Sequence, residues 1–149
     1  ARGLVAALAL GADGINMGTR FMATREAPIH DNIKQRLVEA TERDTALIFR
    51  TMRNTARVFK NEVAAEVRAI EAAGNATIDD VKHLVEGERG RKALEEGDSE
   101  GGVWSAGMVA GLIHDIPTCQ ELVDRIIREA EALIDERLAR MRSAPPVLS

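Results

Sequence analysis

The chain has 149 residues, which is enough for one domain with a sizeable core. A composition of 45% hydrophobic and 30% charged residues is typical of a folded soluble protein and argues against disorder. The net charge of −4 leaves no basic surplus for nucleic acid, and no apolar run approaches the roughly 20 residues of a membrane-spanning helix. The only cysteine is Cys119, which excludes an internal disulfide and a cysteine metal cluster. We expect a cytoplasmic protein that binds neither nucleic acid nor membrane.

The opening stretch, ARGLVAALALG, has apolar side chains at helical spacing and ends at Gly11, a typical helix stop. Residues 15–17 then predict a short buried strand, which ends at Gly18 and Thr19. A helix, a tight turn and a strand are half of a βαβ unit. Because the chain also starts without Met and inside a helical turn, we expect a preceding strand upstream of Ala1.

Residues 28–40 predict the next helix, with Pro28 at its first position and Ile33 and Leu37 in its buried stripe. Residues 45–61 are dense in Thr, Ile, Phe and Val. This composition predicts one or two strands, and a helix is the alternative.

Three further helices are expected in the middle of the chain. Residues 61–74 carry branched apolar side chains at helical spacing and end on a glycine. Thr77 and Asp80 are typical of a capping box and predict a helix over residues 77–85. Another short helix is expected between two glycines, over residues 87–97.

The last part of the chain predicts a hinge, a buried segment and a closing helix. Residues 99–102, SEGG, predict a flexible hinge, and the small apolar residues 103–113 predict a buried segment. Thr118 and Glu121 form a second capping box that opens the closing helix. The expected buried stripe of that helix is Leu122, Ile126, Ala130, Leu133, Ile134, Leu138 and Met141. The final residues, APPVLS, predict a frayed tail.

The strand end at Gly18 and Thr19 is a candidate phosphate site. Glycine lets a phosphate approach bare backbone N–H groups, the threonine hydroxyl adds a donor, and a helix start adds positive dipole potential. In eight-stranded parallel barrels the phosphate commonly lies in the loops after the last two strands. The alternative is an ordinary turn with an N-cap, because two residues are a weak signal.

Four segments carry a resemblance to a known family. They are GLVAALALGADGINMGTRFMATREAPIH (3–30), RTMRNTARV (50–58), RGRKALEEGD (89–98) and WSAGMVAGLI (104–113). Together they resemble the FMN-dependent nitronate monooxygenase family, formerly called 2-nitropropane dioxygenases. The arginine-rich and Ser-Ala-Gly segments are most similar to the branch characterised as NADH:quinone reductases. Family members are longer, and this chain is similar to their C-terminal half.

The resemblance implies an α/β fold, the C-terminal part of a (β/α)8 TIM barrel with a mainly helical inserted subdomain. Residues 1–24 would be the last barrel βα unit with its phosphate-binding turn. Residues 25–102 would form the mainly helical subdomain, and residues 103–149 the return segment and closing barrel helix.

The resemblance also implies which residues bind FMN. The final strand of the family presents its Gly-Thr backbone to the FMN phosphate, and this pair maps onto Gly18 and Thr19. Asn16 and Met17 lead into it. These positions are the expected phosphate end of the cofactor site.

An Ala-Gly-Gln segment beside the flavin ring edge of the family maps onto Ala106, Gly107 and Met108. Methionine replaces glutamine here, which removes a polar contact to the flavin. The other glycine-rich phosphate loop and the catalytic histidine of the family map upstream of this chain. We therefore assign no catalytic residue and expect the chain alone to be inactive.

The resulting prediction is part of an FMN-dependent NAD(P)H:quinone reductase that acts on a small-molecule substrate. The first alternative is a nitronate monooxygenase that oxidises alkyl nitronates. The second alternative is a non-catalytic helical module, because a lone final βα unit leaves a face and a strand edge uncovered. We expect a missing N-terminal half or a second copy of the chain to cover them.

Other residues allow two interpretations. Three histidines are too scattered to define a metal site or an acid/base pair, and solvated positions are expected for His30, His83 and His114. Three arginines also allow two interpretations: Arg50, Arg53 and Arg57. They could form a cationic wall that attracts a nicotinamide dinucleotide or an anionic substrate. Alternatively, they pair with nearby glutamates on a solvated face. Trp104 either covers the flavin or substrate cavity or anchors the core. Cys119 is either a reactive thiol or a passive small residue.

Overall fold

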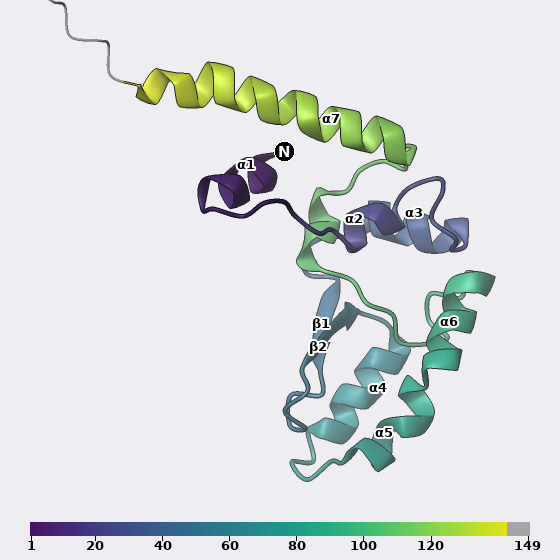
Figure 1. The fold of residues 1–149 in the computed structure, drawn as a ribbon. Helices are drawn as coiled ribbons and strands as arrows, with labels where there is room; N and C mark the ends of the chain where they lie inside the picture. The colour runs from purple at the N-terminus through teal and green to yellow at the C-terminus, as the bar shows by residue number, and fades with distance from the viewer. Residues whose placement is uncertain (143–149) are drawn as a thin grey trace, which may run out of the picture. The chain divides into compact units, whose positions relative to one another are not determined.

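The structure is a computed structural model, and residues 1–142 of it are described (Figure 1). The predicted frayed tail lies outside the described residues. The chain divides into two compact units, Gly18–Pro117, and Ala1–Met17 with Thr118–Ser149. The described part is a helix-rich α/β fold. None of its helices is both long enough and apolar enough to cross a membrane.

The bounds of the elements follow in chain order. They are α1 (Arg2–Ala9), α2 (Thr19–Met22), α3 (Asp31–Glu39), β1 (Thr45–Ile48), β2 (Ala56–Phe59), α4 (Glu62–Glu71), α5 (Ile78–Val85), α6 (Gly87–Glu96), the 3-10 helix η1 (Met108–Leu112), α7 (Cys119–Ala132), the π-helix η2 (Leu133–Leu138) and the 3-10 helix η3 (Ala139–Met141).

In the smaller unit, α1 packs against α7 and η2. The predicted helix stop is confirmed, because Gly11 has a φ of 94°, in the left-handed region that glycine adopts readily. The second capping box is confirmed as well, since the N–H of Glu121 donates to the hydroxyl of Thr118 at 3.1 Å. Leu122 and Ala130 are buried, as their place in the predicted stripe requires.

The last turns of the closing helix differ from the prediction. Ile134, Leu138 and Met141 are 47%, 36% and 81% exposed, although all three were expected to be buried. The element that packs against them in this unit is α1, which has only eight residues and leaves the rest of the stripe uncovered.

The predicted strand over residues 15–17 is not formed within residues 1–142. The segment has no strand pairing, and Ile15 is 41% exposed. A strand requires a neighbour whose backbone pairs with its own N–H and C=O groups, and the described chain places none there.

In the larger unit, α3 begins after His30 rather than at Pro28. The Nδ1 atom of His30 accepts the N–H of Asn32 at 3.1 Å, so this exposed histidine serves as the N-cap. Ile33 and Leu37 are fully buried, as predicted. They belong to a core cluster with Phe59 and Trp104, among other residues.

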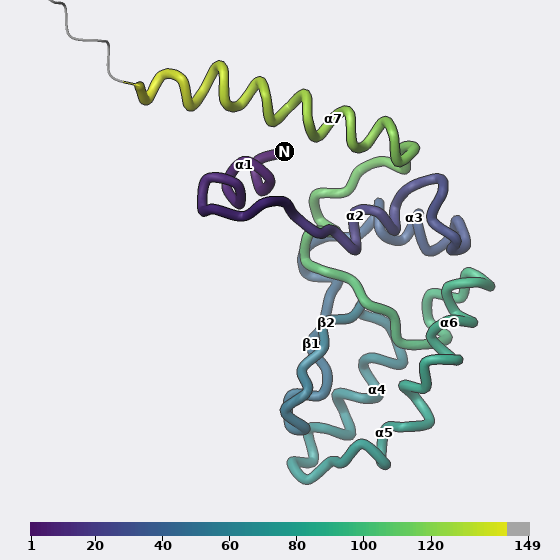
Figure 2. Tube along the Cα trace, in the orientation of Figure 1, coloured from purple at the N-terminus to yellow at the C-terminus, as the bar shows by residue number. Residues whose placement is uncertain are grey.

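The strands predicted over residues 45–61 are confirmed as a hairpin of β1 and β2 (Figure 2). The pairing is antiparallel, with Leu47 opposite Arg57. Because side chains alternate between the faces of a strand, Ile48 and Val58 lie on the opposite face from that pair. These two are buried in a second core cluster with residues of α4 and α5. One face of the hairpin therefore packs on helices, and the other face carries Arg57.

The helices predicted in the middle of the chain are confirmed as α4, α5 and α6. Val63 and Val67 are buried on α4. At the start of α5, the N–H and the hydroxyl of Thr77 both donate to the carboxylate of Asp80 at 2.8 Å, as expected for the capping box. Gly97 ends α6 with a φ of 78°.

Residues 99–102 form a turn that side-chain hydrogen bonds hold in place, instead of the predicted flexible hinge. The buried Asn61 donates from Nδ2 to the carbonyls of Ser99 and Gly102, at 2.7 and 2.8 Å. Nε of Arg89 donates to the carbonyl of Gly101 at 2.7 Å. The backbone of the turn is thus held by side chains that lie far from it in the sequence.

The segment 103–113 is buried on one side only. Trp104 and Ile113 are buried, whereas Met108 and Leu112 are 51% and 72% exposed. The reason is that residues 108–112 turn as the helix η1, which presents successive side chains to different directions. Ser105 is exposed as well, so the prediction of a wholly buried segment was wrong.

Candidate functional site

The structure brings together two of the predicted cofactor-binding segments. The backbone N–H of Gly107 donates to the Oγ1 atom of Thr19 at 2.9 Å. Both residues are half-buried and belong to the larger unit. A Cβ placed on Gly107 would lie 3.4 Å from that same Oγ1, so glycine allows the close approach. Since the hydroxyl accepts from Gly107, its own proton is available to donate elsewhere.

Gly18 and the first residue of α2 present backbone donors at the same turn. Gly18 is exposed, and a Cβ built on it meets no atom within 4 Å. Within residues 1–142, no hydrogen bond from the N–H of Gly18 or Thr19 is found. The following helix α2 has only four residues, so the expected contribution of a helix dipole is small. Local N–H groups and the hydroxyl are the main donors here.

A second link joins the same two segments. Nη2 of Arg20 donates to the carboxylate of Asp115 at 2.8 Å, and Nη1 donates to the Asp115 carbonyl at 3.1 Å. The side chain of Arg20 is only 12% exposed. Nearby, the N–H of Arg25 donates to the carbonyl of Pro117 at 2.9 Å. The segments 18–25 and 106–117 therefore run side by side.

Sequence reasoning missed Arg20 and Asp115. The available signal was their position, since each directly follows a residue that was already singled out, Thr19 or His114. Two opposite charges at the edges of two candidate segments could have suggested that the segments meet.

The other predicted cofactor residues have different surroundings. Ala106 is 2% exposed and packs in the core, so only its backbone can face a ligand. Met108 is 51% exposed and begins η1. Met17 is half-buried and ends the first segment of the smaller unit.

Trp104 is a core anchor. Its ring stacks on Phe59 with the centroids 4.3 Å apart, and its Nε1 donates to the carbonyl of Ser99 at 3.1 Å. It is 3% exposed, which leaves no ring face for a flavin or substrate. Of the two interpretations of this residue, the structural one is correct.

The histidines and the cysteine do not form a second centre among the described residues. No group of three or more His, Cys, Asp or Glu side chains in residues 1–142 converges as a metal site would require. His83 and His114 are exposed, and Cys119 is half-buried in the first turn of α7.

The family model described as nitronate monooxygenase matches residues 1–129. A curated relative from Rhodococcus jostii (strain RHA1), named (3aS,4S,5R,7aS)-5-hydroxy-7a-methyl-1-oxo-octahydro-1H-indene-4-carboxyl-CoA dehydrogenase, is 30% identical over 90% of this chain and 48% of its own. A probable nitronate monooxygenase from Staphylococcus haemolyticus (strain JCSC1435) is 28% identical over 89% of this chain and 36% of its own.

Among solved structures, FabK from Thermotoga maritima superposes with a TM-score of 0.83 at 31% identity. The match covers 93% of this chain and 43% of FabK. This chain thus spans less than half the length of the relatives it matches. The chain belongs to the nitronate monooxygenase family, as the resemblance of its segments indicated.

Proposed function

We propose that this chain is part of an FMN-dependent oxidoreductase and that Gly18 and Thr19 bind the FMN phosphate. The observation that carries the proposal is the 2.9 Å hydrogen bond from Gly107 to Thr19, which joins the two segments that the family resemblance relates to FMN. Membership of the nitronate monooxygenase family and the likeness to FabK support it. By the same likeness, the segment that leads into Gly18 is the last strand of a (β/α)8 barrel in the complete protein.

The donors at this turn suit a phosphate. A phosphate dianion offers only acceptors, and it meets here the N–H groups of Gly18 and Thr19 and the free proton of the Thr19 hydroxyl. The open space around Gly18 lets a tetrahedral anion reach the backbone. At the other end of the site, the half-exposed Met108 would place a thioether beside the flavin, in place of an amide.

When bound, FMN supplies the electron transfer, and the chain supplies position and polarity. Gly18 and Thr19 would fix the phosphate, and Gly107 would hold the Thr19 hydroxyl in the orientation that donates to it. The tie between Arg20 and Asp115 would keep the phosphate turn and the 106–108 segment at a constant separation.

We favour NAD(P)H as the reductant and a quinone as the acceptor, because segments 50–58, 89–98 and 104–113 resemble the reductase branch. The name of the Rhodococcus relative, a dehydrogenase, supports hydrogen transfer over oxygen insertion. Oxidation of an alkyl nitronate is the second candidate, favoured by the name of the Staphylococcus relative. The chain by itself is expected to be inactive, so the tests below use the complete protein.

Anaerobic reduction distinguishes these reactions. Loss of the flavin absorbance on addition of NADH or NADPH supports the reductase, and loss only with an alkyl nitronate supports the monooxygenase. A complete protein that purifies colourless, and takes up no FMN on reconstitution, would overturn the proposal in favour of a helical module.

Substitution of Thr19 tests the phosphate site itself. Thr19→Val keeps the shape but loses the hydroxyl, and it should weaken FMN binding about tenfold or more, the effect of one lost hydrogen bond to a charged group. Thr19→Ser keeps the hydroxyl and should bind FMN nearly as well. Equal FMN affinity of the two variants would contradict the assignment of Thr19.

A further inference from the structure

A groove with a strongly basic lining runs beside β1. Its volume is about 350 Å³, and four cationic side chains line it, namely Arg50, Arg57, Lys60 and Arg68. We call it the basic groove. A second hollow of about 410 Å³ continues from it and shares Leu47, Arg50 and Arg68 as lining residues. Such a concentration of positive charge is notable in a chain whose net charge is −4.

The hairpin register directs one of these cations outward. Arg57 lies opposite Leu47 on the face of the hairpin that turns away from Ile48 and Val58, which are buried against α4 and α5. Its Nη1 donates to the Oγ1 of Thr45 at 2.9 Å, so the guanidinium is held along β1 and keeps its remaining donors for a ligand.

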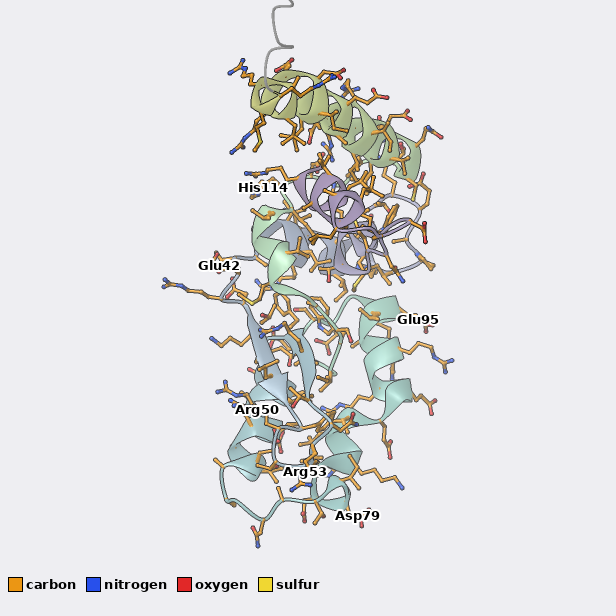
Figure 3. The ribbon with its side chains drawn as sticks, turned by 60° about the vertical axis from the view of Figure 1, so that its left-hand side comes forward. Glu42, Arg50, Arg53, Asp79, Glu95 and His114 are labelled. Atoms are coloured by element: carbon orange, nitrogen blue, oxygen red, sulfur yellow. The ribbon has the colours of Figure 1, made fainter. Side chains whose placement is uncertain are left out.

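A buried carboxylate positions a second cation. Glu71, 8% exposed, accepts the N–H of Phe49 at 2.9 Å and the N–H of Thr51 at 3.3 Å, on either side of Arg50. Phe49 has a φ of 61°, a conformation that costs energy for an aromatic residue and persists only where the surroundings impose it. The loop that carries Arg50, at the end of the hairpin (Figure 3), is therefore held by Glu71 next to the groove that Arg50 lines.

Three of the four cations have no ion-pair partner in the described chain, whereas Lys60 interacts electrostatically with the carboxylate of Asp44. Within residues 1–142, no carboxylate lies within 4.0 Å of a side-chain nitrogen of Arg50, Arg57 or Arg68. The predicted pairing of Arg50 and Arg57 with glutamates is therefore wrong. Glu71 lines the adjoining hollow, but its oxygens are engaged by the loop N–H groups and by the Thr51 hydroxyl. Four cations thus line one groove, and its three arginines have no carboxylate within ion-pair distance in residues 1–142, which favours an anion as their partner.

We infer that the basic groove binds an anion with two linked phosphate groups. Arginine guanidinium groups match phosphate oxygens with pairs of N–H donors. Several cations spread along a groove suit two linked phosphate groups better than a single phosphate. This site is separate from the proposed FMN turn, and it needs no FMN. The linked phosphates could be the diphosphate of a nicotinamide dinucleotide, and this assignment rests on the proposed reductase function. They could also be the diphosphate of another nucleotide-bearing substrate.

The inference is tested by calorimetric titration of the complete protein with inorganic pyrophosphate at about 0.15 M salt, without FMN. The variant Arg50→Gln/Arg68→Gln should bind at least about tenfold more weakly, since each arginine loses a charged hydrogen bond. The control Arg53→Gln/Arg91→Gln removes the same charge. Arg53 lies in the hairpin loop and Arg91 on α6, and neither lines the groove. The control should bind within about twofold of the parent protein, because neither side chain lines the groove and charges outside it are largely screened at this ionic strength.

Any of the following outcomes would overturn the inference. The first is that pyrophosphate does not bind at millimolar concentration. The second is that both double variants bind equally more weakly. The third is that Arg50→Gln/Arg68→Gln binds as tightly as the parent protein while circular dichroism shows that it is folded. Backbone amide shifts on titration should centre on Leu47, Thr51 and Arg68, and shifts elsewhere would also contradict it. If NADH competes with pyrophosphate for the groove, the dinucleotide is the source. If ADP competes and NADH does not, the source is another nucleotide.

Glu71→Gln separates positioning from direct binding. Glu71 touches the loop and not the proposed anion, so the glutamine variant should lower pyrophosphate affinity by loosening Arg50 while the chain remains folded. Direct repulsion between Glu71 and the anion would instead raise the affinity of this variant, and that result would contradict the positioning role.

Discussion

The hydroxyl of Thr19 accepts the N–H of Gly107, and this bond joins residues that are 88 positions apart in the chain. The amide of Gly107 should therefore be protected from hydrogen exchange. In Thr19→Val the bond is lost, and exchange at Gly107 should accelerate about fivefold, as a net bond worth about 1 kcal/mol implies. Exchange measured by NMR checks this, with Thr19→Ser as the control that retains protection. Unchanged exchange in the valine variant would mean that the bond does not persist in solution.

The ion pair of Arg20 and Asp115 should contribute more to stability than exposed pairs do. Asp115→Asn should lower the free energy of unfolding by about 1 kcal/mol, less than a fully buried charged bond because Asp115 is 45% exposed. Glu95→Gln is the matched control, since Glu95 and Arg91 are 3.9 Å apart and both well exposed, and its effect should be near zero. Urea unfolding measures both. Equal effects would show that the pair at the site is no stronger than a surface pair.

Two glycines of α6 should respond differently to alanine. A Cβ on Gly90 would lie 2.5 Å from the carbonyl oxygen of Val103, whereas a Cβ on Gly87 meets nothing within 4 Å. Gly90→Ala should cost about 1–3 kcal/mol of unfolding free energy because backbone must move apart. Gly87→Ala should be neutral or slightly stabilising, since alanine favours a helix. Thermal and urea unfolding compare them, and similar stabilities would refute the close packing of α6.

Trp104 should be a major contributor to the core. Trp104→Phe keeps a ring beside Phe59 but loses the donor to the Ser99 carbonyl, and should cost about 1–3 kcal/mol. Trp104→Ala removes the ring and should cost about 3–5 kcal/mol. Denaturant unfolding followed by circular dichroism gives both values. A phenylalanine variant as unstable as the alanine variant would point to the hydrogen bond, and not the ring, as the main contribution.

The start of α5 should lose stability in acid. The pKa of Asp80 lies below its ordinary value of 3.8, first because the N–H of Thr77 donates to the carboxylate and second because the Thr77 hydroxyl does. A carboxyl whose pKa is lower in the folded state stabilises the fold above its unfolded pKa. That stability is lost as the pH falls through the folded pKa.

Titration of the Asp80 carboxyl by NMR should give a midpoint below 3.8. The Asp80→Asn variant cannot titrate, so this part of the acid dependence should disappear from its unfolding curve. A midpoint at or above the ordinary value would contradict the capping interaction.

Local signals in the sequence predicted local structure well. The capping boxes at Thr77 and Thr118 depend on residues three positions apart, and the structure contains both. The hairpin followed from composition, because branched and aromatic side chains favour a pleated surface. Such features need no knowledge of distant parts of the chain.

Features that depend on distant partners were predicted poorly. The turn at residues 99–102 looked flexible because Gly and Ser dominate it, yet Asn61 and Arg89 hold it. The only signal for the pairing of Arg20 with Asp115 was that each follows a residue already singled out. The contact of Thr19 with Gly107 was accessible only through resemblance to a family, which assigns both segments to one cofactor.

The N–H of Arg25 donates to the carbonyl of Pro117 at 2.9 Å, and the N–H of Gly107 donates to Thr19. The hairpin and its helices therefore begin and end beside the same turn. The hairpin and its helices can therefore change in length or charge while the turn at residues 18–25 keeps its geometry. The hydrogen bond between Arg25 and Pro117 would then keep residues 18–25 in place whatever the length of the segment between them.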